Sequence, residues 1–455
     1  MARIKNVDVI NGNLFRSIVI YSIPIMLINL VQNLFNSVDI MVLGYVADTN
    51  AVASVGATTA IVSLMVHTFF GISSGSRVVL ARFLGEGHER KIKRTVSTSL
   101  ITAALIGIFI AVLGIALAKP FLIWTDCPQE CIDGARLYIQ IYMAAAPAML
   151  LYNFGTAVLN VSGDTQRPLY YMLISGVLNV ALNFLLCFVL PQKVAAVAIS
   201  TAVSQIVGAV LVMRRLCAME GVCRIDLRKL QWSKYAFRKI MYNGIPIALA
   251  TALYPFSNLQ IQSQVNALGT AAMAGNTATA SIEGFVSSIA NAPFGSAVGV
   301  FVGQNLGAKN EKRVKRSILY CLGLGVGIGA VLSVLSIWYT RPLASLYVHG
   351  DAAALTAAMI RRKYVLGIYF LACYNGVMGN VIQAFGYSVF STANNIISVL
   401  GFRFFWTYVI YPSHMNFDWL CLCYSVSWTL VAIFHTSFFM YVYFGKYKKG
   451  KLKKM

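Results

Sequence analysis

Two carboxylates lie within long apolar stretches, whereas the other thirteen acidic residues fall near the N-terminus, in loops or at the ends of such stretches. Asp39 lies in "VQNLFNSVDIMVLG" and Glu283 lies in "TATASIEGFVSS". An ionised Asp near the centre of a membrane helix costs roughly 2.5–3.5 kcal/mol on insertion scales, so each residue needs a partner or a function. A buried carboxylate can bind and release a proton or a cation, which is the chemistry of ion coupling.

Asp39 belongs to a stripe of polar residues on one helix face. The stripe has spacings of three, four and three residues: Asn29, Gln32, Asn36 and Asp39. A second stripe has steps of four: Ser175, Asn179 and Asn183. We expect the two stripes to meet across a cavity, where Asp39 binds a proton or Na⁺. The alternative is a protonated Asp39 that serves only as an interhelical hydrogen-bond donor.

Glu283 and Arg403 each allow more than one interpretation. Glu283 either lines a cavity or anchors unwound backbone near Asn291 to Gly295, where Pro293 removes a helical hydrogen bond. Arg403 could bind an anionic substrate or pair with Glu283, and the alternative is a structural Arg that extends to the membrane surface. The single histidines His67 and His435 are expected to be core residues.

Composition identifies the class of protein that holds these residues. Hydrophobic residues make up 58% of the 455 residues and charged residues 11%, against roughly 25% charged in soluble domains. We therefore predict an all-α integral membrane protein. The first apolar stretch, 17–46, is too long for a signal peptide. Twelve transmembrane helices are predicted, at 15–44, 51–76, 95–118, 134–157, 169–190, 194–215, 238–266, 272–302, 317–338, 360–384, 389–411 and 418–444.

An internal repeat divides these helices into two sets of six. "FRSIVIYSIPI" at 15–25 matches "FRKIMYNGIPI" at 237–247, and "FLGEGHERKIKR" at 83–94 matches "NLGAKNEKRVKR" at 305–316, both 222 residues apart. The repeat also supports a helix at 238–266, which is polar. Six helices return the chain to its starting side, so we predict two parallel repeats related by an axis along the membrane normal, to which the family resemblance described below adds a central cleft between them. The expected parts are an N-terminal lobe (1–220), a linker (221–237), a C-terminal lobe (238–445) and a basic tail (446–455).

Charge distribution predicts the topology. With both termini in the cytoplasm, 29 of the 37 Lys and Arg lie inside, seven lie outside and Arg403 lies within a span. The run Arg361 to Lys363 is the local exception. The net charge of +22 is then an orientation signal beside anionic lipid in the plasma membrane, and we expect no nucleic-acid partner. Cys127 and Cys131 could form a disulfide if the outer side is oxidising.

Several function classes are excluded by what the spans contain. A channel would repeat a ring of like side chains, but the repeat positions of Asp39 and Glu283 are Ile261 and Ile61. An enzyme would need a nucleophile and base or a metal cluster, and the spans hold isolated His and scattered Cys. We therefore expect no enzyme activity, no cofactor and no metal site other than Na⁺ at Asp39.

Four segments resemble the multidrug and toxic compound extrusion (MATE) family: "VASVGATTAI", "FLGEGHERKIKR", "VGQNLGAKNEKRVKRS" and "SIEGF". The resemblance spans essentially the whole chain. It implies two six-helix lobes that open alternately to either side, and export of organic, lipophilic cations in exchange for protons or sodium. We expect a monomer. The alternative is a flippase for lipid-linked oligosaccharide or lipid from the same wider superfamily, which would need a strongly basic central cleft.

The resemblance also assigns residues. Asp39 matches the helix 1 carboxylate of the DinF-like and archaeal-type members, Gln32 matches its polar partner, and Asn179 matches the first Asn of the motif Asn-x-x-x-Asp, whose Asp position is here Asn183. The Glu and Asp of the NorM-like branch are absent from "TALYPFSNLQ" and "FLACYNGVMGNV", so the chain looks closer to the DinF-like branch. The expected coupling residues are Asp39, Gln32, Asn36, Asn179 and Asn183. The expected substrate-cavity residues are Asn153, Thr201, Asn258, Gln262, Glu283 and Arg403.

Overall fold

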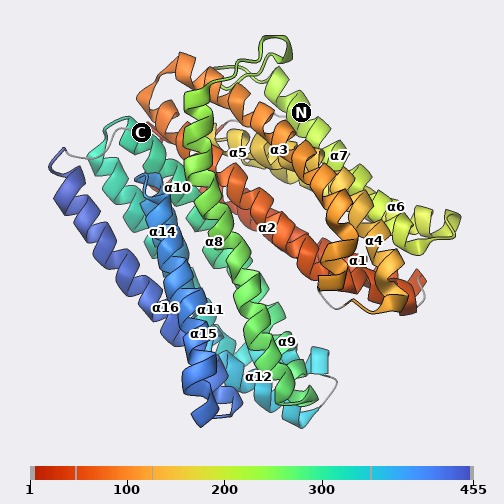
Figure 1. The fold of residues 1–455 in the computed structure, drawn as a ribbon. Coiled ribbons are helices and arrows are strands. Elements are labelled where there is room, and N and C mark those ends of the chain that lie inside the picture. Colours follow the sequence, from red (N-terminus) through yellow and green to blue (C-terminus); the bar gives the residue numbers. More distant parts are fainter. Residues whose placement is uncertain (1–5, 47–48, 125–126, 349–350, 451–455) are drawn as a thin grey trace. The chain divides into compact units, whose positions relative to one another are not determined.

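The computed structural model describes the backbone of residues 6–46, 49–124, 127–348 and 351–450; within these, the side chains of 36–46, 49–53 and 60 are not described. Regular structure in these ranges is helical throughout, as the sequence predicts (Figure 1). The first half contains α1 (Leu14–Val46), α2 (Thr49–Glu86), α3 (Glu89–Trp124), α4 (Gln129–Ala144), α5 (Ala146–Val161), α6 (Gln166–Val189) and α7 (Lys193–Ala218). The second half contains α8 (Lys234–Ala267), α9 (Thr270–Val286), α10 (Ala292–Gly307), α11 (Glu311–Val348), α12 (Ala352–Tyr364), α13 (Tyr369–Ala384), α14 (Ser388–Asn395), α15 (Phe402–Phe405) and α16 (Phe417–Met440).

Short turns of 3-10 or π geometry precede, join or extend several of these helices: η1 (Leu227–Lys229), η2 (Ser287–Asn291), η3 (Leu366–Ile368), η4 (Ile396–Gly401), η5 (Trp406–Ile410), η6 (Tyr411–Ser413) and η7 (Tyr441–Tyr447). The π turn η2 ends two residues before Pro293, which lacks the backbone N–H that a regular helix needs. The expected unwound backbone at Asn291 to Gly295 is therefore wrong, because the chain stays helical through this region and only widens by one turn.

Ten helical runs in the described residues are long and apolar enough to cross a membrane, and the bent pair α4 and α5 makes an eleventh. Their positions coincide with eleven of the twelve predicted spans. The remaining prediction, 238–266, coincides with α8, a continuous helix of 34 residues that is not among the eleven. The helix at 238–266 is thus confirmed, and its passage through a membrane stays a prediction.

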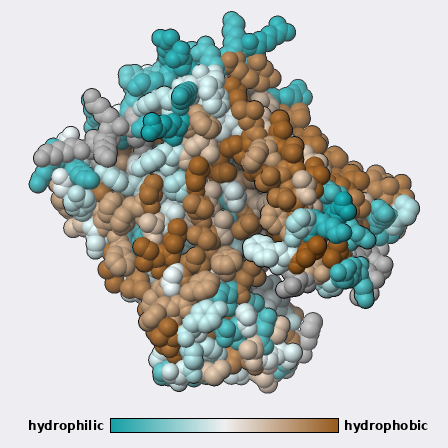
Figure 2. Space-filling view, viewed as in Figure 1, coloured by the Kyte–Doolittle hydropathy of each residue, from teal (hydrophilic) through white to brown (hydrophobic). Residues whose placement is uncertain are grey.

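Apolar side chains cover much of the visible surface (Figure 2). On α3, Phe109 and Val112 are 63% and 65% exposed, and at the repeat positions on α11, Val331 and Val334 are 58% and 56% exposed. Exposed apolar faces of this extent are costly in water and stable against lipid. The same outward-facing positions are therefore apolar in both halves.

The described chain groups into two compact units. Unit 1 contains residues 1–7 and 27–248, and unit 2 contains 8–26 and 249–455. Each unit thus takes the beginning of one long helix, α8 or α1, from the other half of the sequence. The two division points, after Met26 and after Ala248, are 222 residues apart, which is the offset of the sequence repeat. The expected lobes, 1–220 and 238–445, assign each half of the sequence to one lobe, so they differ from these units at 8–26 and 238–248.

The exchanged segments bury equivalent faces. Ile18 of α1 and Ile240 of α8 are both fully buried, and Ile25 and Ile247 are 8% and 4% exposed. In unit 1, α8 approaches α2 so closely that a Cβ on Gly75 would lie 2.4 Å from the Ile240 carbonyl oxygen. In unit 2, Tyr21 of α1 packs edge-on against Phe301 of α10, with ring centroids 5.6 Å apart. The repeated "FRxI" segments therefore serve as packing elements in both units.

The repeated basic motifs hold the segments that lead into these helices. In unit 1, Arg94 Nε donates to Gln231 Oε1 at 3.3 Å, and the Ser233 N–H donates to Thr98 Oγ1 at 3.0 Å. In unit 2, Arg313 donates from both Nη atoms to the Gly12 carbonyl at 3.0 Å and from Nη2 to the Val9 carbonyl at 3.1 Å. Beyond any role in membrane orientation, these motifs fix the chain before α8 and before α1.

Candidate functional site

A charged cluster lies inside unit 2. We name it the arginine cluster; its members come from α8, α9, α12, α15 and α16 and are Ser257, Asn258, Gln262, Asn276, Glu283, Arg361, Arg403, Tyr424 and Ser427. Two of its guanidinium groups belong to residues that are almost fully buried, Arg361 at 4% exposed and Arg403 at 1%. Buried Arg side chains in a membrane protein are costly and mark functional sites by default.

Arg361 bridges two residues of α9. Its Nη2 lies 2.6 Å from Glu283 Oε2, and its Nη1 donates to Asn276 Oδ1 at 2.6 Å. Asn276 in turn donates to Gln262 Oε1 at 2.8 Å, which connects α9 to α8. Both distances to Arg361 are those of charge-assisted hydrogen bonds. The Glu283 side chain remains 20% exposed, so the pair lies at the edge of the cluster rather than sealed inside it.

Local sequence explains why α9 and α12 come this close. Asn276 and Glu283 are seven residues apart and therefore share one face of α9. Next to them, Gly275 contacts α12 so tightly that a Cβ would lie 2.3 Å from the Ala354 carbonyl oxygen. Asp351 caps α12 by accepting hydrogen bonds from the Ala353 and Ala354 N–H groups. A small residue at the crossing and a capped helix start thus position Arg361 against the carboxylate.

Arg403 is held by neutral groups. Its Nη1 donates to Asn258 Oδ1 at 3.0 Å and to Ser257 Oγ at 3.3 Å, and its Nε donates to Ser427 Oγ at 3.4 Å. Within the described residues it forms no salt bridge to a carboxylate. These contacts fix the guanidinium between α8 and α16 without neutralising its charge.

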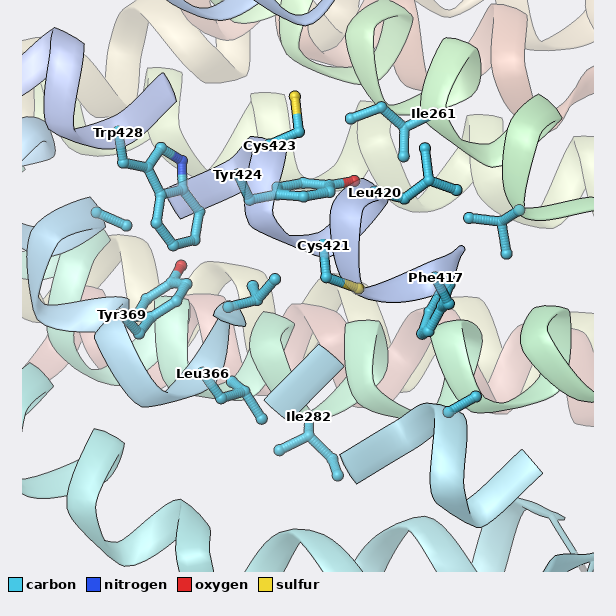
Figure 3. Packing of buried hydrophobic residues seen from close by; sticks show 14 of the residues in the cluster. Ile261, Ile282, Leu366, Tyr369, Phe417, Leu420, Cys421, Cys423, Tyr424 and Trp428 are labelled. Atoms are coloured by element: carbon cyan, nitrogen blue, oxygen red, sulfur yellow. The ribbon is translucent and has the colours of Figure 1, made fainter. Parts of the chain in front are cut away.

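Tyr424 joins the two arginines. The guanidinium carbon of Arg403 lies 4.2 Å from the centroid of the Tyr424 ring, and that of Arg361 lies 5.0 Å from it. Figure 3 shows Tyr424 within the apolar core of unit 2, near Cys421 and Leu420 and one helical turn from Trp428. Cation–π contact with a desolvated ring stabilises each guanidinium, but it supplies no negative charge. The cluster therefore holds two cationic groups and one carboxylate.

Three sequence hypotheses about these residues can now be decided. Arg403 does not extend to the surface, because it is 1% exposed, and it does not pair with Glu283, because Arg361 does so instead. Asn258, Gln262 and Glu283, predicted as separate cavity candidates, are brought into one cluster with Arg403. Arg361 was missed, although its violation of the positive-inside pattern was the signal that could have found it.

Unit 1 holds a neutral counterpart, which we name the amide cluster: Asn179, Asn183 and Thr201. Asn183 Nδ2 donates to Asn179 Oδ1 at 3.3 Å, and Asn179 Nδ2 donates to Thr201 Oγ1 at 3.3 Å. Asn183 is fully buried and Asn179 is 8% exposed. Three of the predicted first-lobe residues are thus linked between α6 and α7.

Helix α1 contacts α6, the helix of Asn179 and Asn183, through Phe35, which is not part of the predicted polar stripe. The Phe35 ring occupies the space over Gly176 of α6, where a Cβ would lie 1.9 Å from it. Gln32, one turn earlier, is exposed. The side chains of Asn36 and Asp39 lie outside the described residues, although α1 continues through both positions. Asn153 donates to the Met149 carbonyl of its own helix at 2.8 Å and joins no cluster.

The cysteines form no disulfide in the described chain. Cys127 and Cys131 are both free thiols. Cys127 lies between α3 and α4, outside the membrane-spanning helices, where partial burial and the neighbouring Cys131 raise its pKa above the usual value.

Comparison with known proteins identifies the family. The MatE family model matches residues 24–185 and 246–409, one match in each half of the chain. The Probable multidrug resistance protein YoeA of Bacillus subtilis (strain 168) is 26% identical, with 86% of this chain and 85% of that protein covered. The FAD transporter of Shewanella oneidensis is 25% identical, with coverages of 76% and 75%.

Solved structures show the same fold. An outward-facing multidrug resistance MATE family transporter of the MOP superfamily has a TM-score of 0.84 at 19% identity, with 99% of each chain covered. A MOP superfamily transporter from Pyrococcus furiosus has a TM-score of 0.86 at 18% identity, covering 96% of this chain and 99% of that one. With the helices, the two polar clusters and the family match at both halves, the chain belongs to the MatE family of membrane transporters.

Proposed function

We propose that the protein is a secondary active antiporter that exports small organic compounds in exchange for protons or Na⁺. The observation that carries this proposal is the pair of polar clusters, one in each unit, inside helices whose outer faces are apolar. Membership of the MatE family supports transport, and relatives that are named as multidrug resistance proteins support organic compounds as cargo.

The proposed mechanism is alternating access of the two lobes. Ion binding at Asp39 and cargo binding favour different states, so an inward ion gradient drives export through differences in affinity of a few kcal/mol. The contact between Phe35 and Gly176 supports an ion site shared by α1 and α6, since it brings the helix of Asp39 against that of Asn179 and Asn183. Gln32 and Asn36 are the proposed further ligands.

The proposed cargo class follows from two sources. The resemblance favours lipophilic cations, whereas the arginine cluster favours compounds with an acidic group, and an FAD transporter is among the relatives. The flippase for lipid-linked oligosaccharide is not favoured, because similar proteins such as YoeA, MepA and the Shewanella oneidensis protein are named for multidrug resistance, multidrug export and FAD transport.

The test is uptake of a fluorescent organic compound into inverted vesicles under an imposed proton gradient and, separately, a Na⁺ gradient. Gradient-driven uptake is expected in the wild type. It is expected to fall at least about tenfold in Asp39→Asn, because the carboxylate proposed to bind the coupling ion is lost. Asp133→Asn, the same change at an exposed position, is the control. Equal uptake in wild type and Asp39→Asn would contradict the coupling role, and no uptake in the wild type would contradict transport.

Orientation is proposed with both termini in the cytoplasm of the producing cell, on the basis of the Lys and Arg distribution. A fluorescent protein that matures only in the cytoplasm, fused after Met455, is expected to fluoresce. A dark fusion of normal abundance would reverse the orientation.

A further inference from the structure

The charge of Arg403 is uncompensated in the arginine cluster. Its three hydrogen-bond partners are hydroxyl and amide oxygens, and the nearby carboxylate of Glu283 is engaged by Arg361. A guanidinium that is 1% exposed and lacks a counter-ion is strongly unfavourable. Such a charge is retained where a ligand supplies the opposite one.

The unused hydrogen-bond donors of Arg403 and Arg361 also indicate an anionic ligand. Arg403 has five N–H groups, and the two on Nη2 donate to no described residue. Arg361 uses Nη1 and Nη2, but its Nε is buried without a partner in the described chain. Two arginines that contact one ring, that of Tyr424, thus both retain donors. Unused guanidinium donors match the oxygens of a carboxylate or a phosphate.

Three aromatic side chains lie beside the charged groups of the arginine cluster. Trp428 packs edge-on against Tyr369 with centroids 5.7 Å apart, and both lie in the core shown in Figure 3. Together with Tyr424 they pack beside the charged groups, and each of the three side chains is 4–6% exposed. Glu283 is 20% exposed and neutralises one of the two cationic groups, so a single anionic group completes the charge balance.

We propose that the arginine cluster binds the carboxylate or phosphate group of an organic anion, so that the cargo class includes organic anions. Arg403 supplies the free donors, Arg361 supplies the second positive charge, and Tyr424 holds both guanidinium groups in place. The inference rests on the proposed transport function, which it narrows to a class of substrate.

The test uses two dyes with one scaffold and opposite charge. Carboxyfluorescein is a xanthene anion and rhodamine 6G is a xanthene cation. Fluorescence anisotropy of each dye is measured with the purified full chain in phosphatidylcholine nanodiscs. Wild-type protein is expected to bind carboxyfluorescein, with phenyl phosphate and benzoate as competitors that distinguish phosphate from carboxylate. Failure of the wild type to bind carboxyfluorescein would overturn the inference.

Variants locate the site. Arg403→Gln is expected to weaken carboxyfluorescein binding at least about tenfold, the effect of losing one charge-assisted contact, and to leave rhodamine 6G binding unchanged. Arg403→Lys keeps the positive charge but lacks the planar guanidinium, so it is expected to lower carboxyfluorescein affinity by less than Arg403→Gln does. It also provides a test of the site if the Gln variant does not fold. Arg341→Gln, an exposed position on α11, is the control. Unchanged carboxyfluorescein affinity in the Gln variant, or in the Lys variant where the Gln variant does not fold, would overturn the proposal.

Two further experiments distinguish the anion site from a failure of the proposed transport function and from lipid binding. Uptake of both dyes into proteoliposomes tests transport itself: uptake of rhodamine 6G alone would keep the proposed transport function and overturn the anion site, whereas uptake of neither would overturn transport. Nanodiscs with phosphatidylglycerol test whether a lipid headgroup is the anion. Unchanged affinity there supports a soluble organic anion, and loss of dye binding would assign the cluster to lipid instead.

Discussion

The amide cluster of unit 1 and the arginine cluster of unit 2 differ in charge although the halves that contain them repeat. Asn179, Asn183 and Thr201 are neutral residues linked by two hydrogen bonds. In unit 2, the carboxylate of Glu283 pairs with Arg361, whereas Arg403 has no carboxylate partner among the described residues and keeps donors unused. One cluster carries no formal charge, and the other is complete only with a further negative charge.

The framework of the two halves does not differ in the same way. Ile18 and Ile240 are both fully buried, and the division between units falls at repeat-equivalent positions. In contrast, the positions that correspond to Asp39 and Glu283 are Ile261 and Ile61, which are 2% and 8% exposed. The repeated helices thus share packing residues but differ at these two polar positions, and a buried polar residue needs partners that a given half must provide.

The largest effect is expected from breaking the ion pair of the arginine cluster. Arg361→Gln leaves the Glu283 carboxylate without its 2.6 Å partner, and the free energy of unfolding is expected to fall by about 3 kcal/mol. The double variant Arg361→Gln with Glu283→Gln is expected to lose less than Arg361→Gln alone. Thermal unfolding in one detergent, analysed as a double-mutant cycle, measures both. Additive losses would mean that the pair does not couple.

An intermediate effect is expected at the helix crossing of unit 1. Gly75→Ala places a Cβ 2.4 Å from the Ile240 carbonyl oxygen and 2.5 Å from the Gly244 nitrogen, so backbone must move at a cost of about 1–3 kcal/mol. Gly56→Ala in the same helix meets nothing within 4 Å and is the control. Unit 2 already has Ala297 at the equivalent position. Equal unfolding temperatures for the two variants would contradict the close crossing.

The smallest effect is expected in the amide cluster. Asn183→Ala removes the 3.3 Å hydrogen bond to Asn179 and is expected to lower the free energy of unfolding by about 1 kcal/mol, near the modest values for hydrogen bonds between membrane helices. Asn153→Ala, whose side chain bonds only to its own helix, should lose less. The same unfolding measurement compares them. A loss at Asn183 as large as that at Arg361 would remove the distinction between the clusters.

Much of the candidate site was predictable as single residues but not as an arrangement. Glu283 and Arg403 stand out in sequence because ionisable residues are rare in apolar helices. Their pairing, one of the alternatives that the sequence left open, does not occur, since Glu283 meets Arg361, which lies 78 residues further along the chain. Spacing on one helix predicted the link between Asn179 and Asn183, because residues four apart share a face. Thr201, on a different helix, entered through the family resemblance.

The sequence by itself determined the helices, the apolar runs that suit a membrane and the repeat of 222 residues, because hydropathy, helix length and self-similarity are properties of contiguous residues. It also singled out Glu283 and Arg403 as charged residues within apolar stretches. Only the tertiary structure decided that 8–26 packs with the second half and 27–248 with unit 1, and which arginine has a carboxylate. The packing of 8–26 and the pairing of Glu283 depend on which helices approach closely enough for their side chains to meet. The distance between two helices cannot be derived from the sequence of either helix alone.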